Sequence, residues 1–289
     1  VNDDGFYSMM IGATDMGTGC DTILAQMAAD CLDTHVDNIV VYGVDTDISP
    51  YDSGSYASST TYLTGNATIK TCQMLREKII AAGAEMLEID IEDADFDGEK
   101  VYSVKEEKSI TLKDIANNVM CYSNHTLTAT AKEKTPVSPP PYMAGAVEIE
   151  LDKETGHVEI IDYATCVDCG TVINPALATV QTEGGLVQGI GMALYEDVQY
   201  DKRGRILNDS FMQYKIPTRL DMGKIRVEYE SSYEPSGPFG AKSIGELVIN
   251  TPSPALCHAI YNASGVWINE LPMTSEKIAM GILKNNLEA

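Results

Sequence analysis

A proline-rich segment sets the strongest limit on how this chain can fold. Four of the six residues from Pro136 to Pro141 are prolines. Proline lacks a backbone N–H and has a fixed φ, so this segment cannot be helical and is expected to be extended. Strand-like and helix-like patterns occur both before and after it. We therefore predict two subdomains, residues 1–135 and residues 136–289.

The first subdomain shows apolar runs typical of strands and apolar spacings typical of amphipathic helices. Strands are predicted at residues 6–13 and 38–44, and helices at residues 21–32 and about 58–82. The pair Asp97–Gly98 predicts a hairpin turn. Thr111 is a candidate N-cap for a helix that follows it.

The second subdomain shows the same mixture. Strands are predicted at residues 146–152, 157–167, 211–217 and 224–230, and helices at residues 177–197, 253–265 and 275–286. The order is not a strict repeat of strand, helix and strand. The predicted fold class is α+β, with two related subdomains of mixed strands and packed helices.

The charge excludes two classes of partner. The net charge is -23, whereas nucleic acids and anionic membrane surfaces are bound by basic patches. We therefore expect neither nucleic acid nor membrane as a partner. The first ten residues lack the basic and apolar regions of a secretory leader, and no apolar run approaches the roughly 18 residues that span a bilayer.

The seven cysteines are few, odd in number and unevenly spread, which favours a reducing cytoplasm over a disulfide framework. Cys166 and Cys169 form the only CxxC motif. A single CxxC without a second pair is a weak signal for a metal site, and we interpret the two as small, mostly buried thiols.

Two loops carry small and polar residues at the start of a predicted helix. The loop from Gly12 to Thr22 contains three glycines, and N–H groups at a helix start suit an anion. It matches neither the dinucleotide fingerprint nor the phosphate loop of nucleotidases, so an ordinary connection fits it equally well. The run from Ala57 to Thr61 has four consecutive hydroxyls. This exceeds what capping requires and indicates a site for a polar ligand.

Four glycines fall inside the predicted helix 177–197, at positions 184, 185, 189 and 191. Each costs up to about 1 kcal/mol relative to alanine. Close packing against another backbone explains them, and so does a ligand lying on the helix beside Gln188. Further along, Glu246 ends the run "GAKSIGE", where the glycines allow close approach of the backbone.

Taken in order, these motifs resemble one family. "GATDMGTGCDT", "YASSTTYLTGNA", "VDCGTVINPALATVQTEGGLVQGIGMALYED", "GAKSIGE" and "LPMTSEKI" are similar to the C-terminal half of the molybdopterin-binding subunit of the xanthine dehydrogenase/aldehyde oxidase family, the molybdenum hydroxylases. The resemblance runs from about Phe6 to about Leu283. It implies the molybdopterin-binding fold of the xanthine dehydrogenase type.

The resemblance also implies roles for particular residues. Glu246 matches the catalytic base beside the metal, and the family usually has glutamine where this chain has Thr18. The residues implied to bind the cofactor are Gly17, Thr18, Gly19, Cys20, Ala57, Ser58, Ser59, Thr60, Gln188 and Gly189. In the family the molybdenum is held by the pterin dithiolene, so no metal-ligating side chain is expected.

The implied enzyme hydroxylates a heteroaromatic ring or an aldehyde carbon with oxygen from water. The cofactor would be molybdenum-molybdopterin, with its cytosine dinucleotide form left open. Purine, nicotinate and aldehyde are all open as small-molecule substrates. The family's glycine- and phenylalanine-rich loop and its arginine loop are not found in this sequence. The implied partners are therefore the N-terminal molybdopterin-binding part, an iron–sulfur subunit with two-iron clusters and an FAD subunit.

Two alternatives stay open at this level. The chain fits a catalytically silent subunit that only encloses the cofactor, and it fits an unrelated acidic module that binds a phosphate ligand on its glycine loops. The presence of Glu246 favours the enzyme over the silent subunit.

Overall fold

The computed structural model describes residues 1–123, 126–134 and 137–288. Contacts divide the chain into two compact units. One consists of Val1–Pro139 and Tyr233–Ser243, the other of Pro140–Ser232 and Ile244–Ala289. The predicted boundary between residues 135 and 136 lies outside the described residues. The segment Tyr233–Ser243 belongs to the first unit through its contacts, although it is far away in the sequence.

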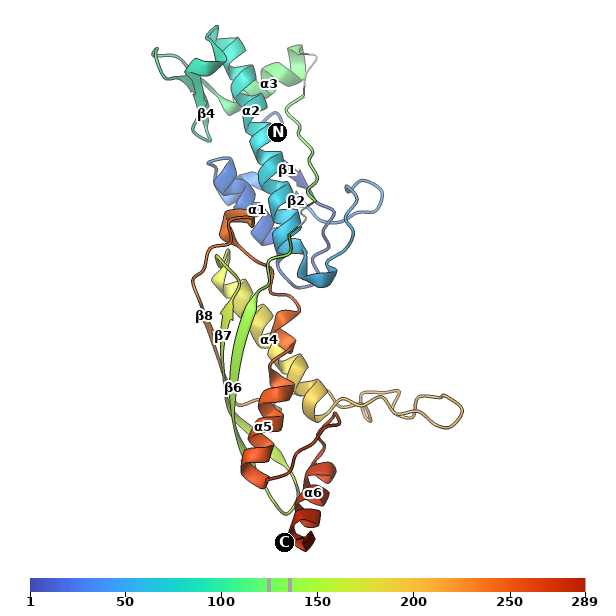
Figure 1. Cartoon of the computed structure of the whole chain (residues 1–289). Coiled ribbons are helices and arrows are strands. Elements are labelled where there is room, and N and C mark those ends of the chain that lie inside the picture. Colours follow the sequence, from blue (N-terminus) through green and yellow to red (C-terminus); the bar gives the residue numbers. More distant parts are fainter. Residues whose placement is uncertain (124–125, 135–136, 289) are drawn as a thin grey trace. The chain divides into compact units, whose positions relative to one another are not determined.

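The first unit is built around a long helix, α2 (Gly65–Leu87), which packs against α1 (Cys20–Cys31) (Figure 1). Strands β1 (Tyr7–Met10) and β2 (Ile39–Tyr42) pair in parallel, with Tyr7 opposite Ile39. A parallel pair needs a crossover connection, and α1 supplies it. The first predicted helix is confirmed, and both predicted strands are found, but each has four residues where eight and seven were predicted.

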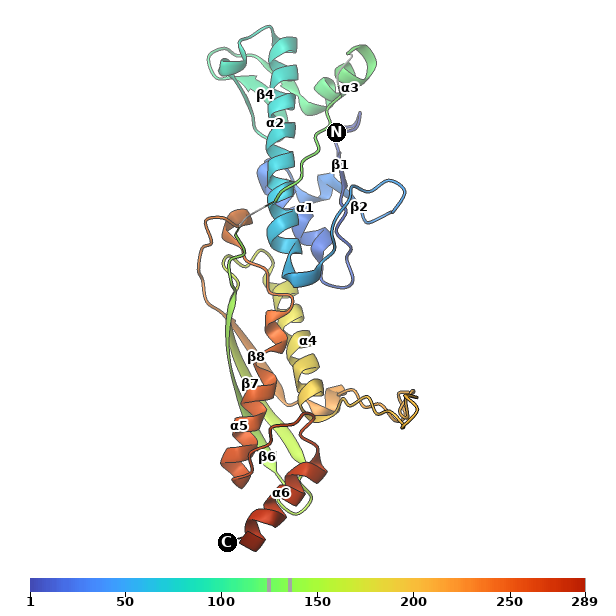
Figure 2. The same ribbon diagram turned by 45° about the vertical axis from the view of Figure 1, so that its right-hand side comes forward.

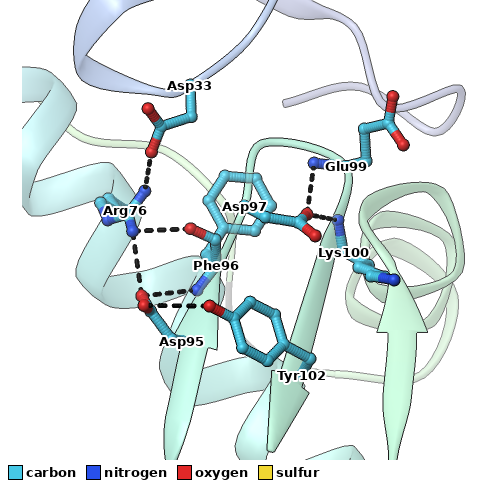
Figure 3. Close-up of polar contacts among 8 residues, drawn as sticks. All are labelled: Asp33, Arg76, Asp95, Phe96, Asp97, Glu99, Lys100 and Tyr102. Atoms are coloured by element: carbon cyan, nitrogen blue, oxygen red, sulfur yellow. Dashed lines mark hydrogen bonds and ion pairs between the residues drawn. The ribbon is translucent and has the colours of Figure 1, made fainter. Parts of the chain in front are cut away.

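A three-stranded antiparallel sheet covers the far part of α2. Its strands are β3 (Ala94–Phe96), β4 (Lys100–Ser103) and β5 (Ser109–Thr111), followed by α3 (Leu112–Tyr122). The predicted hairpin is confirmed, because Asp97 accepts the backbone N–H groups of Glu99 and Lys100 at 3.1 and 2.9 Å (Figure 3). The predicted N-cap is confirmed too, since the Thr111 side chain accepts from the backbone N–H of Asp114.

The second predicted helix begins later than expected. The α-helix starts at Gly65 and is preceded by a π-helical turn, Thr60–Thr64. Ala57 and Ser58 have φ of 53° and 52°, in the left-handed region. Non-glycine residues adopt that conformation at a steric cost, and it cannot continue into a right-handed helix.

The second unit is a three-stranded mixed sheet with helices on one face (Figures 1 and 2). The sheet contains β6 (Tyr142–Leu151), β7 (Val158–Asp168) and β8 (Lys224–Tyr229), and the helices are α4 (Pro175–Leu194), α5 (Pro252–Ser264) and α6 (Ser275–Glu288). β6 and β7 are antiparallel, whereas β7 and β8 are parallel. The predicted α+β class with mixed strands and packed helices is confirmed. Of the described helices, none is both long and apolar enough to cross a bilayer.

One predicted strand is wrong. Residues 211–217 form turns and irregular chain, with the backbone N–H of Tyr214 bonded to the carbonyl of Ser210. They lie in an arm that leaves the end of α4 (Figures 1 and 2), where Phe211 is 81% and Met212 85% exposed. β-propensity reflects packing against neighbouring strands, and this apolar run pairs with no strand of the described chain.

Arg76 ties α2 to the antiparallel sheet (Figure 3). Its guanidinium donates to the carbonyl oxygen of Phe96 at 2.6 Å, to Asp95 at 3.0 Å and to Asp33 at 2.9 Å. It also lies 5.6 Å from the centre of the Phe96 ring. Three acceptors converge on one planar cation, which is the geometry that arginine serves better than lysine.

We predict that Arg76→Met lowers the free energy of unfolding by about 1–3 kcal/mol, because three acceptors lose a charged donor. Lys70→Met is the matched control on the same helix. Lys70 makes one exposed ion pair with Glu133, so its loss should change stability by about 0–1 kcal/mol. Urea unfolding of both variants measures their free energies of unfolding. Equal losses in the two variants would contradict the role given to Arg76.

Candidate cofactor site

The loop at the start of α1 is organised by its own carboxylate. One oxygen of Asp15 accepts the backbone N–H groups of Gly17 and Gly19 at 2.9 and 3.1 Å, and the other accepts that of Asp21 at 3.3 Å. Gly17 and Gly19 have φ of 100° and 77°, which only glycine adopts readily. The sequence left an anion site and an ordinary connecting loop equally open for this segment. The bonds of these N–H groups to Asp15 favour the connecting loop, and a cofactor contact of the loop stays a prediction.

Three potential metal ligands meet in this loop, since the ligand atoms of Asp15, Cys20 and Asp21 lie within 4.8 Å of one another. Burial and the nearby charges of Asp15 and Asp21 raise the pKa of the Cys20 thiol to about 12. Partial burial raises the pKa of Asp15, but the N–H bonds together outweigh it and lower that pKa. A protonated thiol beside a carboxylate engaged by the backbone is a poor metal site.

The loop before α2 holds strained backbone and side-chain hydroxyls. Ala57 and Ser58 keep the left-handed conformation described above, and such strain concentrates at ligand sites. The Ser59 hydroxyl donates to the Gly54 carbonyl at 3.2 Å and so does not cap a helix. Ala57 is exposed, whereas Ser58, Ser59 and Thr60 are half-buried.

The segment Tyr233–Ser243 packs on the start of α2. The Tyr62 hydroxyl donates to Ser236 Oγ at 2.7 Å, and the Tyr62 backbone N–H donates to Ser243 Oγ at 3.1 Å. Gly65 allows this approach, because a Cβ there would lie 2.7 Å from Pro238 Cγ. The first half of "GAKSIGE" thus shares a unit with the loop that contains Ala57. The sequence carried no signal for this contact, since serine hydroxyls are common.

Two of the glycines in α4 are explained by packing. A Cβ on Gly185 would lie 2.0 Å from Val248 Cγ2, and a Cβ on Gly189 would lie 2.7 Å from Pro252 Cγ and 2.8 Å from the Ile249 carbonyl oxygen. Val248 is fully buried. The chain that follows Glu246 therefore lies directly on the helix backbone. Gly189 packs against the Ile249–Pro252 segment. Its contact with a cofactor stays a prediction.

The other face of α4 is open. Gly184 is exposed, and a Cβ there would meet no atom of the described chain within 4 Å. Gln188 follows one turn later and is also exposed. Residues four apart share a helix face, so the Gln188 amide stands beside a flat patch of backbone.

Glu246 directly precedes the turn Leu247–Ile249, which packs on α4. The side-chain amide of Gln181 donates to the Gly245 carbonyl oxygen at 3.1 Å. Glu246 itself is exposed. The sequence-predicted base is therefore an exposed residue beside a turn that packs on α4. Sequence reasoning missed Gln181, for which a glutamine on a helix gives no distinct signal.

The predicted site residues fall into both units. The first unit holds Gly17, Thr18, Gly19, Cys20, Ala57, Ser58, Ser59 and Thr60, and the second holds Gln188, Gly189 and Glu246. Within the first unit, α1 packs against the turn Thr60–Thr64, and Gly12 lies against Pro50 and Asp52. The two loops therefore belong to one packed region. Of the CxxC pair, Cys166 is exposed on β7 and Cys169 is buried just after it.

In each unit, taken by itself, the predicted cofactor-binding residues include neutral polar groups, which suit a polar organic cofactor better than a bare ion. Ser58, Ser59 and Thr60 offer neutral hydroxyls, and Gln188 offers an amide. The open patch at Gly184 leaves room for a flat group against the helix backbone. Hydroxyls and amides hydrogen-bond to the heteroatoms of a pterin ring as well as to phosphate oxygens.

Comparison with known proteins decides the family. The family model for the molybdopterin cofactor-binding domain matches residues 1–223. The chain belongs to this family. The resemblance predicted from the motifs is confirmed, and this molybdopterin-binding chain is related to molybdenum-cofactor oxidoreductases.

Individual relatives agree. The chain is 34% identical over 289 residues to the "probable hypoxanthine oxidase XdhD" of Escherichia coli (strain K12). The matched region covers 98% of this chain and 30% of the relative. It is 33% identical over 284 residues to the xanthine dehydrogenase molybdenum-binding subunit of Escherichia coli O157:H7, covering 96% and 38%. The chain thus spans about a third of the length of these relatives.

A solved structure shows the same fold. Quinoline 2-oxidoreductase from Pseudomonas putida 86 is similar with a TM-score of 0.88 and 27% sequence identity. The similarity covers 98% of this chain and 37% of the solved chain. The molybdopterin-binding fold of the xanthine dehydrogenase type is therefore confirmed.

The adjacent glycines of α4 give a matched test of the packing. We predict that Gly185→Ala lowers the free energy of unfolding by about 1–3 kcal/mol, because its Cβ forces the Val248 turn away from the helix. Gly184→Ala should instead stabilise by up to about 1 kcal/mol, since it adds helix propensity at an open position. Urea unfolding compares the two, and a neutral Gly185→Ala would show that the turn is not held by this contact.

Proposed function

We propose that this chain is part of the cofactor-binding region of a molybdenum hydroxylase, with Glu246 as its catalytic base. The observation that carries the proposal is the exposed position of Glu246 next to a turn anchored to α4, in a chain of the molybdopterin-binding family. A base must be held in place while remaining open to the reacting group.

The chain's own residues would divide the work. Gln188 and the hydroxyls of Ser58, Ser59 and Thr60 would bind and orient the cofactor, together with the loop that contains Thr18. The bound cofactor supplies the two-electron redox chemistry at molybdenum. A carboxylate oxygen of Glu246 would accept a proton during the hydroxylation of an electron-poor carbon. The proposal covers molybdopterin both with and without its cytosine dinucleotide.

The substrate class follows from the family. An electron-poor heteroaromatic ring or an aldehyde is the substrate we propose. Hypoxanthine and xanthine occur in the names of two relatives, which makes a purine the first substrate to test. Nicotinate and simple aldehydes complete the panel.

Partners are part of the proposal, since one relative is named as a molybdenum-binding subunit. The arm between α4 and β8 supports it. The large apolar side chains of Phe211, Met212 and Leu220 are 81%, 85% and 96% exposed. Exposed apolar surface of this kind is often covered by a partner. We infer that the arm contacts the N-terminal molybdopterin-binding part of the enzyme. An iron–sulfur subunit with two-iron clusters and an FAD subunit would carry electrons onward. A cytoplasmic location stays a prediction from cysteine usage.

The phosphate-binding alternative loses its main support. It needs free N–H groups at the start of α1, and those of Gly17, Gly19 and Asp21 are bonded to Asp15. A second anion beside that carboxylate would be repelled.

We predict that Glu246→Gln lowers the turnover of the assembled complex by about 10²–10⁴, because an amide of the same shape cannot act as a base. Molybdenum content should stay unchanged, since the proposal does not place Glu246 among the groups that hold the cofactor. The matched control is Glu159→Gln, an exposed glutamate on β7, which should keep normal turnover.

Turnover with a dye acceptor and molybdenum content are measured on the same samples. Normal turnover of Glu246→Gln at full molybdenum occupancy would remove Glu246 from the role of base. A silent subunit would give no dependence on this residue at all.

We also predict that the isolated chain binds molybdenum cofactor only in traces. Gln188, Ser58, Ser59 and Thr60 are exposed or half-buried, whereas cofactor sites bury most of the ligand surface. Metal analysis of the purified chain tests this, with the assembled complex as the positive control. One molybdenum per isolated chain would mean that this part alone encloses the cofactor.

A further inference from the structure

Three residues on one side of α4 contact the chain segment around Glu246. Gln181, Gly185 and Gly189 are spaced four residues apart, so they lie on one side of the helix. They meet, in the same order, Gly245, Val248 and the Ile249–Pro252 segment. Two of the three contacts are close packing at glycine, and the first is a hydrogen bond from a side chain.

We propose that Gln181 is a positioning residue for Glu246, and that its hydrogen bond to the Gly245 carbonyl sets the direction of the Glu246 side chain. This inference rests on the proposed function of Glu246. Gln181 bonds to the backbone carbonyl of the residue before Glu246, so it acts through the backbone.

The argument comes from peptide geometry. The Gly245 carbonyl and the Glu246 N–H belong to one planar peptide unit, so fixing the carbonyl fixes the N–H as well. On the other side, the Glu246 carbonyl accepts the N–H of Ile249 at 3.4 Å. With both flanking peptide units held, the direction of the Glu246 Cα–Cβ bond is held too.

Glycine at position 245 makes the anchor necessary. A glycine crosses between conformations that other residues cannot reach, so its peptide unit reorients easily when nothing holds it. The packed contact at Val248 begins two residues after Glu246. Gln181 adds a hydrogen bond at the peptide unit that precedes Glu246.

The neighbouring residue separates this role from core packing. Thr182 is fully buried and bonds to the Ala178 carbonyl at 2.9 Å and to the Tyr229 hydroxyl at 3.2 Å. Thr182 therefore holds α4 on the sheet, whereas Gln181 is half-buried and reaches the Glu246 turn. A substitution at Gln181 should leave the fold of α4 intact.

The first arm of the test needs no cofactor. Gln181→Met keeps the length of the side chain and removes the donor. In the full 289-residue chain, hydrogen exchange of the amides from Leu247 to Asn250 should become roughly 2- to 10-fold faster, as expected for the loss of one net hydrogen bond. The matched control is Gln73→Met, an exposed glutamine on α2, which should leave these amides unchanged.

The second arm uses the assembled complex. Gln181→Met should lower kcat about tenfold with KM and molybdenum content nearly unchanged, because a slightly misplaced base still binds substrate. In the Glu246→Gln background, Gln181→Met should cause no further loss, since a residue that acts through Glu246 has nothing left to position.

The outcomes separate the two proposals. Normal turnover of Glu246→Gln overturns the proposed base and this inference with it. A large loss in Glu246→Gln together with unchanged exchange and kcat in Gln181→Met overturns only the inference, as does an additive loss in the double variant. If Gln181→Met does not fold, Gln181→Glu replaces it, because a carboxylate of nearly the same shape also cannot donate to the carbonyl.

Discussion

The close approach of the chain after Glu246 to the backbone of α4 is the contact on which the candidate site depends. Val248 is fully buried at Gly185, and no side chain larger than hydrogen fits at that position without displacing it. Because the turn Leu247–Ile249 sits directly on the helix, the residue before it emerges at a defined point. A base that must meet a reacting group needs such a fixed origin.

Glycine serves three separate purposes in this molecule. At Gly185 it lets the Val248 side chain pack against the helix backbone. At Gly17 and Gly19 it permits left-handed turns that bring two N–H groups to the Asp15 carboxylate. At Gly184 it leaves helix surface open beside Gln188. The same residue type therefore marks packing, loop closure and a candidate ligand surface, and only the surroundings tell these apart.

Several of the proposed cofactor contacts lie at the surface of the chain. The hydroxyls before α2, the Gln188 amide and the Glu246 carboxylate are exposed or half-buried. The chain spans about a third of its relatives' length, at 30% of one and 38% of another. Such a surface gains depth only when further protein covers it, which is why the proposed activity belongs to an assembly.

The sequence alone determined the periodic elements, the hairpin at Asp97–Gly98, the Thr111 cap and the family. Each of these depends on neighbours within a few residues or on motifs in a fixed order. The sequence-based prediction failed at residues 211–217, where the apolar run pairs with no strand of the described chain. It left open whether the Gly17 loop is an anion site, and the bonds of its N–H groups to Asp15 count against that.

Tertiary structure alone decided which groups meet across long separations. Gln181 and Gly245 are 64 residues apart, and Tyr62 and Ser243 are 181 apart. Glutamine, serine and tyrosine are ordinary surface residues whose partners depend on how the chain returns in space. Local pattern carries no information about that return, so the anchor of the proposed base became visible only in the folded chain.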